Sequence, residues 1–162
     1  MLPAQDVRLR SATTDDAAFI VEMARHACVI EDWPLPDADD EDTQSLLPGS
    51  DDIVVVATDA TGIRIGAVWT FRHDPPLMLD TDGLSFPELT IAVAPEMRGT
   101  GVGGALLDEL VSRCAATYDA LTLNVHERNP AAHLYQRKGF RKVGRGRGAL
   151  GIAMRRDLTQ AR

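Results

Sequence analysis

The sequence contains few of the residues on which several classes of protein depend. Only two of its 162 residues are cysteines, and they lie far apart at Cys28 and Cys114. This spacing suits neither a disulfide framework nor a metal site, so we expect two small core residues, a reducing cytoplasm and no bound metal. No apolar run approaches the ~20 residues that cross a bilayer, and the first residues lack the pattern of a signal peptide. We therefore expect no membrane partner.

Charges of one sign are missing from two stretches of the chain. Residues 31–52 carry nine acids and no base, whereas residues 137–156 carry eight bases and no acid. The acidic stretch is either a solvated loop or an attractive field for a cationic amine, and the basic stretch is either a solvated face or charge facing a polyphosphate. Because only 5% of the residues are aromatic and the net charge is −7, we expect no nucleic-acid partner.

Length and residue patterning predict one mixed α/β (α+β) domain over residues 1–162. Apolar residues make up 44% of the chain and charged residues 25%, as in ordinary globular proteins. Alternating or β-branched apolar residues predict strands, and apolar residues that recur every three or four positions predict helices. The expected strands are 5–11, 53–56, 63–71, 88–94, 121–125, 140–143 and 149–158, and the expected helices are 14–30, 39–47, 102–116 and 130–138.

The connection at residues 73–86 is longer than the usual hairpin loop of about 2–5 residues. It carries the apolar side chains of Leu77, Met78, Leu79 and Phe86. Long loops are often functional, so we expect this segment to cover a pocket or to contact a second subunit. The second alternative would make the protein a homodimer.

A turn with four glycines in six residues joins the strand at 88–94 to the helix at 102–116. Glycine permits left-handed backbone angles and close approach by another group. Successive backbone N–H groups at a helix N-terminus bind anions, and the neighbouring Arg98 adds a charge suited to phosphate oxygens. These features predict a cradle for a pyrophosphate. The alternative is that the glycines only make a tight turn.

Two kinds of cradle fit this turn. Gly99-x-Gly101-x-x-Gly104 matches the dinucleotide-binding fingerprint, and Glu127 lies about where the ribose-binding acid belongs. That fingerprint should follow its strand directly, whereas residues 95–98 intervene here. The dinucleotide interpretation is therefore the weaker of the two.

The same residues resemble a more specific signature. Arg98-Gly-Thr-Gly-Val-Gly103 is similar to the R/Q-x-x-G-x-G/A signature of the GNAT superfamily of acyl-CoA-dependent N-acyltransferases, and the strand Ile91-Ala-Val-Ala-Pro95 before it is also similar. The segment from Asn129 to Phe140 resembles the family's N-x-x-A-x-x-x-Y-x-x-x-G-F pattern, which a dinucleotide domain would not predict. The resemblance extends from about Val7 to Leu158. It implies a mixed sheet of six or seven strands, splayed at a bulge near residues 92–94, with helices on both faces.

The resemblance also implies where acetyl-CoA, the acyl donor, would bind. The backbone of the central strand would pair with the pantetheine amides, and the glycine turn would hold the pyrophosphate. The implied cofactor-binding residues are Ile91, Ala92, Val93, Arg98, Gly99, Thr100, Gly101, Val102, Gly103, Gly104 and Asn129. The asparagine is equally suited to capping the helix that follows it.

Acetyl transfer from a thioester to an amine requires a fixed thioester, an amine that loses a proton and a thiolate that gains one. Tyr135 matches the family position that points at the thioester sulfur, and its phenol is protonated at neutral pH, so it is the predicted general acid. Glu88 matches a glutamate that acts as the base in many members, often through water, and is equally well a solvated charge at a strand end. His126 or water stays open as the base, and Asn124 could hold a water or an amide near the pocket.

The sequence thus predicts an N-acetyltransferase that moves an acetyl group from acetyl-CoA to the primary amine of a small molecule. The predicted mechanism is direct attack in a ternary complex. Within the same class, the rival is acetylation of a protein N-terminus or lysine. Outside it, the rival is a non-catalytic module that senses acyl-CoA. The acceptor and the length of the acyl group stay open.

Overall fold

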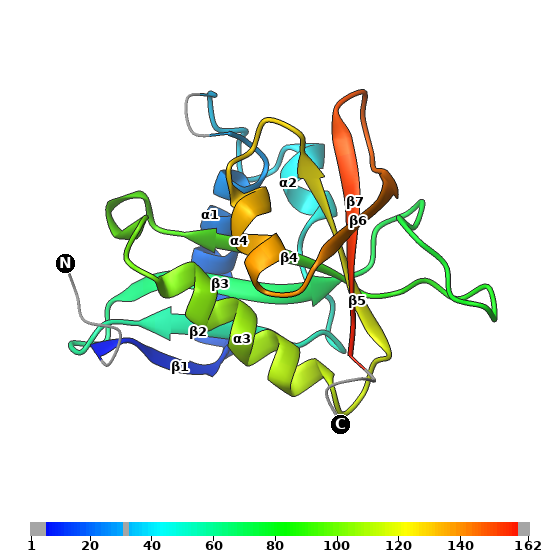
Figure 1. The fold of residues 1–162 in the computed structure, drawn as a ribbon. Coiled ribbons are helices and arrows are strands. Elements are labelled where there is room, and N and C mark those ends of the chain that lie inside the picture. The colour runs from blue at the N-terminus through cyan, green and yellow to red at the C-terminus, as the bar shows by residue number, and fades with distance from the viewer. Residues whose placement is uncertain (1–5, 31–32, 159–162) are drawn as a thin grey trace.

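A mixed sheet of seven strands forms the centre of the computed structural model, which describes residues 6–30 and 33–158 (Figure 1). The strand order is β1-β2-β3-β4-β5-β7-β6, and only the β4–β5 pair is parallel. The strands are β1 (Arg8–Ser11), β2 (Val54–Thr58), β3 (Arg64–Phe71), β4 (Glu88–Val93), β5 (Ala120–His126), β6 (Arg141–Arg145) and β7 (Gly151–Asp157). The predicted fold class is confirmed.

Helices connect and cover these strands. They are the 3-10 turn η2 (Thr14–Asp16), α1 (Ala17–Ala27), α2 (Glu41–Ser45), the 3-10 turn η3 (Pro95–Met97), α3 (Val102–Cys114) and α4 (Ala131–Arg137). The short helix α2 begins where Asp40 accepts a hydrogen bond from the backbone N–H of Asp42 (2.8 Å), as expected of an N-cap aspartate. None of the helices in the described ranges is long and apolar enough to cross a membrane.

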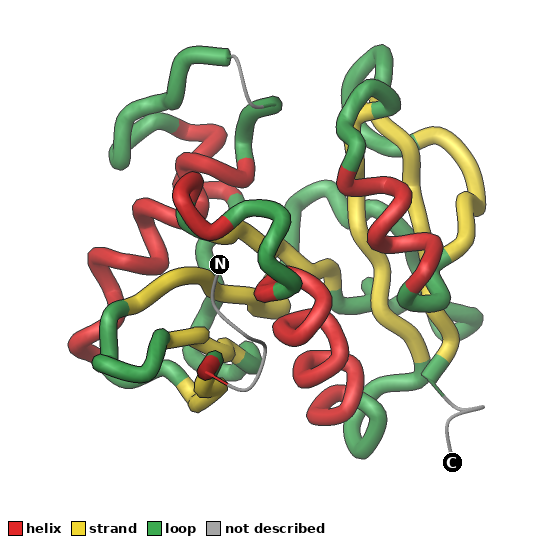
Figure 2. The backbone as a smooth tube through the Cα atoms, turned by 60° about the vertical axis from the view of Figure 1, so that its left-hand side comes forward, coloured by secondary structure: helices red, strands yellow, loops and turns green. Residues whose placement is uncertain are grey.

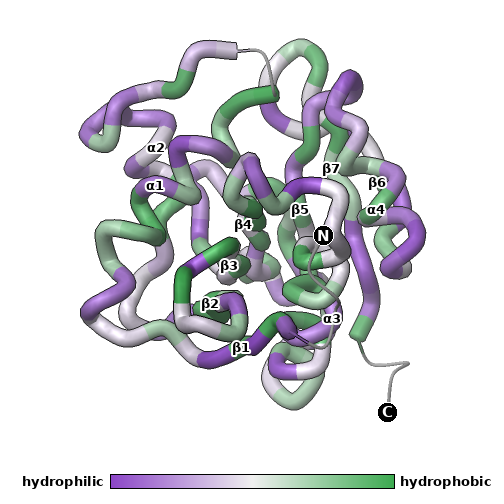
Figure 3. Tube along the Cα trace, turned by 90° about the vertical axis from the view of Figure 1, so that its left-hand side faces the viewer, coloured by the Kyte–Doolittle hydropathy of each residue, from purple (hydrophilic) through white to green (hydrophobic). Residues whose placement is uncertain are grey.

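The helices α1 and α3 lie on opposite faces of the sheet (Figure 2) because successive strand residues point to opposite sides. Val55 and Val68 pack in the cluster that contains the apolar face of α3. Their neighbours Val56 and Ala67 pack in the cluster that contains Ile20 and the rest of the α1 face. Figure 3 shows the hydrophobic strands β3 and β4 inside, between more hydrophilic outer segments. The core thus forms two layers, one on each side of the sheet.

The strands β4 and β5 are paired at one end and then diverge (Figure 1). Their register contains the single pair Glu88 and Thr122, and the Thr122 backbone N–H and hydroxyl both donate to the carbonyl of Pro87 at 3.1 Å. The predicted splay is therefore present. The predicted bulge near residues 92–94 was wrong, because β4 pairs with β3 in one continuous register over its whole length.

The predicted elements are all present, with shifted ends. The first helix ends at Ala27 rather than Ile30, and the last strand begins at Gly151 rather than Ala149. The expected strand at 5–11 is described only from residue 6, and its first residue lies outside the described ranges. The connection at 73–86 contains no helix or strand, and a single isolated bridge joins Leu79 to Ser85 within it.

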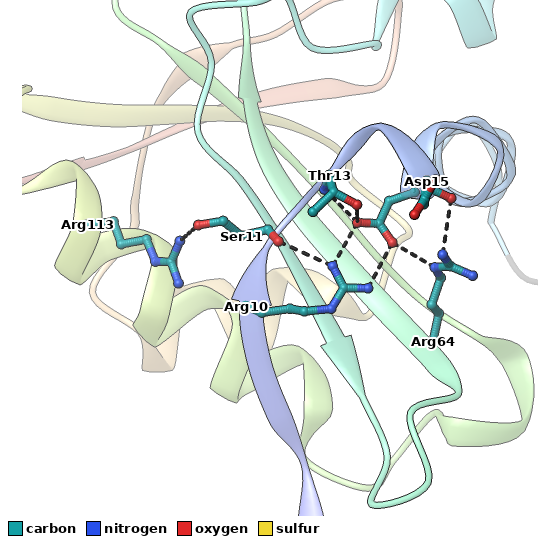
Figure 4. A network of polar contacts seen from close by, with 7 residues as sticks. Arg10, Ser11, Thr13, Asp15, Arg64 and Arg113 are labelled. Atoms are coloured by element: carbon teal, nitrogen blue, oxygen red, sulfur yellow. Dashed lines mark hydrogen bonds and ion pairs between the residues drawn. The ribbon is translucent and has the colours of Figure 1, made fainter.

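A buried aspartate, Asp16, fastens the start of the chain to the sheet, and Figure 4 shows the network of polar contacts to which its partners Arg10, Thr13 and Arg64 belong. The side chain of Asp16 is fully buried and accepts hydrogen bonds from Arg10 (2.7 and 2.9 Å), from Arg64 (2.7 Å) and from the backbone N–H of Thr13 (2.7 Å). The Arg10 guanidinium above all, with Thr13 and Arg64, holds the pKa of the Asp16 carboxyl well below its usual range. This cluster joins β1, η2 and β3.

Candidate active site

A groove of about 1180 Å³ lies along β4, where β5 diverges from it. Its walls come from the end of α1, the glycine turn, the end of β5, α4 and the turn between β6 and β7. All of the predicted site residues line this groove except Thr100. The structure therefore brings together residues that lie up to 47 positions apart, from Glu88 to Tyr135.

The glycine turn has the backbone geometry of an anion cradle. Gly99 and Gly101 have φ angles of +76° and +92°, which L side chains rarely adopt. Gly101 is the N-cap of α3 and has no side chain to bond the first N–H groups of the helix, so these donors face outward for a ligand. The hydroxyl of Thr100 instead donates to the carbonyl of Met97 at 2.5 Å, which explains why it does not line the groove.

The other two glycines of the turn lie against side chains of α4 and of Lys138, which follows it. A Cβ at Gly103 would lie 3.4 Å from Leu134, and a Cβ at Gly104 would lie 3.3 Å from Lys138. Both partners belong to the segment that resembles the second family motif. The two motifs are therefore in contact across the groove.

The exposed edge of β4 forms the floor of the groove. On one side, Ile91, Ala92 and Val93 pair with β3, and on the other side no strand of the described part of the chain pairs with them. Backbone N–H and C=O groups on such an edge are available to an extended ligand. The edge, the cradle and the glycine contacts fit the size and chemistry of acetyl-CoA, whose amides need a strand edge and whose pyrophosphate needs N–H donors.

Tyr135 reaches the groove from α4. It is 8% exposed, and its ring contacts Phe140 edge to face with 6.3 Å between the centroids. Burial raises the pKa of the Tyr135 phenol to about 12. The phenol is therefore protonated at neutral pH, which is the state that the predicted general acid needs, and the role itself stays a prediction.

Glu88 is held by an arginine that sequence reasoning did not select. The side chain of Glu88 is 3% exposed, and its two oxygens accept from the two terminal nitrogens of Arg147 at 2.7 and 2.5 Å. Such a bidentate pair satisfies a carboxylate that burial would otherwise destabilise. Glu88 is therefore not the solvated strand-end charge that was its alternative interpretation.

The two polar residues on β5 have different partners. Asn124 accepts a hydrogen bond from the backbone N–H of Arg147 at 2.8 Å, so it holds an amide, as one of its predicted roles requires. His126 accepts at Nδ1 from the backbone N–H of Arg128 at 3.1 Å, which places the proton of the neutral ring on Nε2. Its free nitrogen is then a donor rather than a base. The His126 ring also contacts Trp33 edge to face at 5.4 Å.

Asn129 performs the capping role that was one of its two predictions. Its side-chain oxygen accepts from the backbone N–H of Ala131 at 2.9 Å, and the residue also lines the groove. Pro130 is the N-cap of α4 and not its first helical residue, so the helix begins one residue later than the sequence predicts. The amide nitrogen of the Asn129 side chain and the second lone pair of its oxygen are left for a cofactor contact.

Comparison with known proteins identifies the family. The family model described as an acetyltransferase (GNAT) domain matches residues 50–142, which is more than half of the chain. The chain belongs to the GNAT family. It is thus an N-acetyltransferase, and acetyl-CoA is its acyl donor.

Solved structures of GNAT proteins share the fold over nearly the whole chain. A GCN5-related N-acetyltransferase from Kribbella flavida is 24% identical, with a TM-score of 0.72 over 96% of this chain and 99% of that one. A phosphinothricin acetyltransferase from Sinorhizobium meliloti, solved in complex with acetyl-CoA, is 26% identical, with a TM-score of 0.71 over 94% and 89%. A mutant spermidine N-acetyltransferase from Vibrio cholerae is 22% identical, with a TM-score of 0.67 over 96% of both chains.

The residues that line the groove and that sequence reasoning did not single out include Arg147, Trp33 and Asp42. The first is flanked by glycines in the segment Gly146-Arg-Gly148, a pattern that could have marked a charged side chain on a shaped turn. The other two lie in or beside the acidic stretch, whose position only the fold reveals. Within the described ranges, no group of three His, Cys, Asp or Glu side chains could hold a metal ion.

Proposed function

We propose that this enzyme acetylates the primary amine of a small, cationic molecule by direct attack in a ternary complex with acetyl-CoA. The main observation behind the proposal is that a single groove extends along β4 from the glycine turn to Glu88. At about 3.4 Å per residue, the five steps from Glu88 to Val93 separate the two ends by about 17 Å. That length accommodates the pantetheine arm of the donor between the cradle and an acceptor site.

In this proposal the donor would be fixed by groups whose positions suit its chemistry. The N–H groups from Gly99 to Gly104 and the guanidinium of Arg98 would hold the pyrophosphate, and the edge of β4 would pair with the pantetheine amides. Held in this way, the thioester reacts as part of a preorganised pair. Such orientation is worth on the order of 7–11 kcal/mol at best.

Two side chains of the groove carry the proton transfers that we propose. Tyr135 would protonate the departing thiolate, which its neutral phenol supports. Glu88 would take part on the acceptor side by accepting a hydrogen bond from the amine or from a water that relays the proton. His126 is less suited to the base role because its Nδ1 lone pair is already used by Arg128.

The acceptor end, defined here as the groove around Glu88, Phe71, His73 and Asp42, is the basis for a small cationic acceptor. The carboxylate of Asp42 lines this groove and would attract a cationic acceptor, whereas the Glu88 carboxylate is paired with Arg147. Phe71 lies opposite Glu88 on β3 and also lines the groove. Trp33 and His126, both groove residues, contact each other from two walls. A walled site favours a small amine over a protein lysine, and it is the reason we prefer the small-molecule acceptor.

The test is release of free CoA thiol from acetyl-CoA with a panel of amines. We expect turnover with short primary amines that carry a second positive charge, and little turnover with peptides. Turnover restricted to peptides would instead support the protein acetyltransferase. Donor binding without turnover on any amine would support the sensor. The cytoplasmic location, the single domain and a homodimer remain predictions that localisation, proteolysis and light scattering can test.

A further inference from the structure

Arg147 connects four segments of the chain at the acceptor end. Its guanidinium pairs with Glu88 at the start of β4 and also donates to the carbonyl of Pro75 at 3.0 Å, in the connection at 73–86. Its backbone N–H donates to Asn124 on β5. The residue itself belongs to the turn between β6 and β7. Among the hydrogen bonds of the described residues, no other residue contacts all of these segments.

The turn that carries Arg147 is shaped by the absence of side chains. A Cβ at Gly146 would overlap the side-chain oxygen of Asn124, and a Cβ at Gly151 would overlap the carbonyl of Arg147. The backbone N–H of Gly146 donates to the carbonyl of Gly151 at 2.9 Å, which closes the turn. The arginine is therefore presented by a defined loop rather than by a loose surface segment.

The stability of the folded protein does not by itself explain the position of this arginine. Its Nε–H is buried and has no hydrogen-bond partner within the described residues, and an unsatisfied buried donor lowers the stability of the folded state. Replacing a buried ion pair with apolar residues often leaves a protein as stable or more stable. The pair is thus better explained by what it does in the groove than by its contribution to folding.

The geometry also limits what Glu88 can do. Of the four lone-pair positions of its carboxylate, two are taken by Arg147 and two are left for the acceptor or a water. Both oxygens are oriented by the fork of the guanidinium, which a lysine cannot reproduce. The direction in which Glu88 meets the acceptor is therefore fixed by Arg147.

We propose that Arg147 is a positioning residue for the acceptor. It orients the Glu88 carboxylate toward the amine and fastens the connection at 73–86 to the same point, so that the acceptor end keeps one shape. This inference rests on the proposed transfer to an amine at Glu88. It assigns Arg147 no role in holding the donor, whose cradle lies at the other end of β4.

The first test is hydrogen exchange, which does not depend on activity. Arg147→Gln keeps the backbone contact with Asn124 but removes the fork. We expect the hydrogen-bonded amides of the connection, those of Asp80, Gly83 and Phe86, to exchange about tenfold faster in this variant, because hydrogen bonds to charged groups are worth about that factor or more. Arg145→Gln, an exposed residue two positions earlier that does not line the groove, is the matched control.

The second test separates the acceptor from the donor. In Arg147→Gln we expect kcat/KM for the amine to fall by about tenfold or more and the KM for acetyl-CoA to change by less than about twofold. Arg147→Lys should recover only part of the loss, because it restores the charge without the fork. The double variant Glu88→Gln/Arg147→Gln should regain the melting temperature lost by the single variant, but not the kinetics.

The outcomes are distinguishable. Exchange of the Asp80, Gly83 and Phe86 amides at the wild-type rate in Arg147→Gln overturns the role of Arg147, whatever the activity. An equal rise in the KM for acetyl-CoA, or recovery of the kinetics in the double variant, also overturns it, because a merely structural role would produce those results. Wild-type enzyme that acetylates no amine overturns the proposed function instead, while the exchange data still decide whether Arg147 holds the connection.

Discussion

Arg64 donates a hydrogen bond of 2.7 Å from its Nε to Oδ1 of Asp16, which lies 48 residues earlier in the chain. The same carboxylate accepts from both terminal nitrogens of Arg10, so one buried charge is shared by two guanidinium groups. The cluster joins the first strand, the first helical turn and the third strand, as Figure 4 shows. A lone buried charge is unfavourable, so the three side chains depend on one another.

Asp16→Asn should therefore destabilise the protein by about 2–3 kcal/mol, a value at the low end for breaking an ion pair because both arginines are partly exposed. The folded-state pKa of Asp16 is lowered, so its contribution to stability is fully present above the unfolded pKa near 4 and is lost as the pH falls below it. Wild-type melting temperatures should thus fall more steeply below about pH 4 than those of Asp16→Asn. Asp15→Asn, an exposed neighbour with no side-chain partner among the described contacts, should behave like the wild type.

Tyr135→Phe should lower kcat by about 10²- to 10⁴-fold, the usual contribution of a general acid, and leave the affinity for CoA nearly unchanged. Because the pKa of the phenol is raised to about 12, the wild-type rate should show no alkaline loss from this group below about pH 10. The control is Tyr118→Phe, the other tyrosine, which does not line the groove. Equal activity in wild type and Tyr135→Phe would remove this residue from the mechanism.

Gly101→Ala tests the cradle against a closely matched position. Gly101 and Gly62 have φ angles of +92° and +91°, and a Cβ at either glycine would meet no atom within 4 Å. Alanine should therefore destabilise the fold by about 1–2 kcal/mol at each position. Only the Gly101 variant should also bind acetyl-CoA more weakly, which calorimetry can measure. Similar donor affinity in both variants would contradict a pyrophosphate site at this turn.

Asp42→Asn tests the acidic acceptor end. With a diamine as acceptor, we expect its KM to rise by about two- to fivefold at low salt, because an exposed charge such as that of Asp42 contributes at most about 1 kcal/mol. The difference should shrink at 0.5 M salt as the field is screened. Asp39→Asn, an exposed acid in the same stretch that does not line the groove, is the control. A salt-independent change, or an equal change in Asp39→Asn, would argue against electrostatic recognition.

The local sequence was enough to predict the elements and the backbone geometry of the glycine turn. The apolar repeat of Val102, Leu106 and Leu110 predicted α3, and these residues are buried on one face of it. The glycines of the turn predicted left-handed angles, and Gly99 and Gly101 have them. Such features depend on neighbours in the chain, so local patterns reveal them.

The acceptor side depends on contacts that local patterns do not encode. The pair of Glu88 and Arg147 spans 59 residues, and it exists only because β5 and β7 bring the last turn beside the start of β4. The contact between Trp33 and His126 likewise joins a loop after α1 to the end of β5. The predicted bulge in β4 failed because the divergence of β5 alone opens the sheet.

The meeting point of Pro87 and Thr122 has a mechanical consequence. Within the sheet, it is the short pairing that joins the strands β1 to β4 to the strands β5 to β7. A donor that bonds the exposed edge of β4 and also contacts α4 would link these two groups of strands where they diverge. Occupancy by acetyl-CoA should thus stiffen the whole molecule, including segments that never touch the coenzyme.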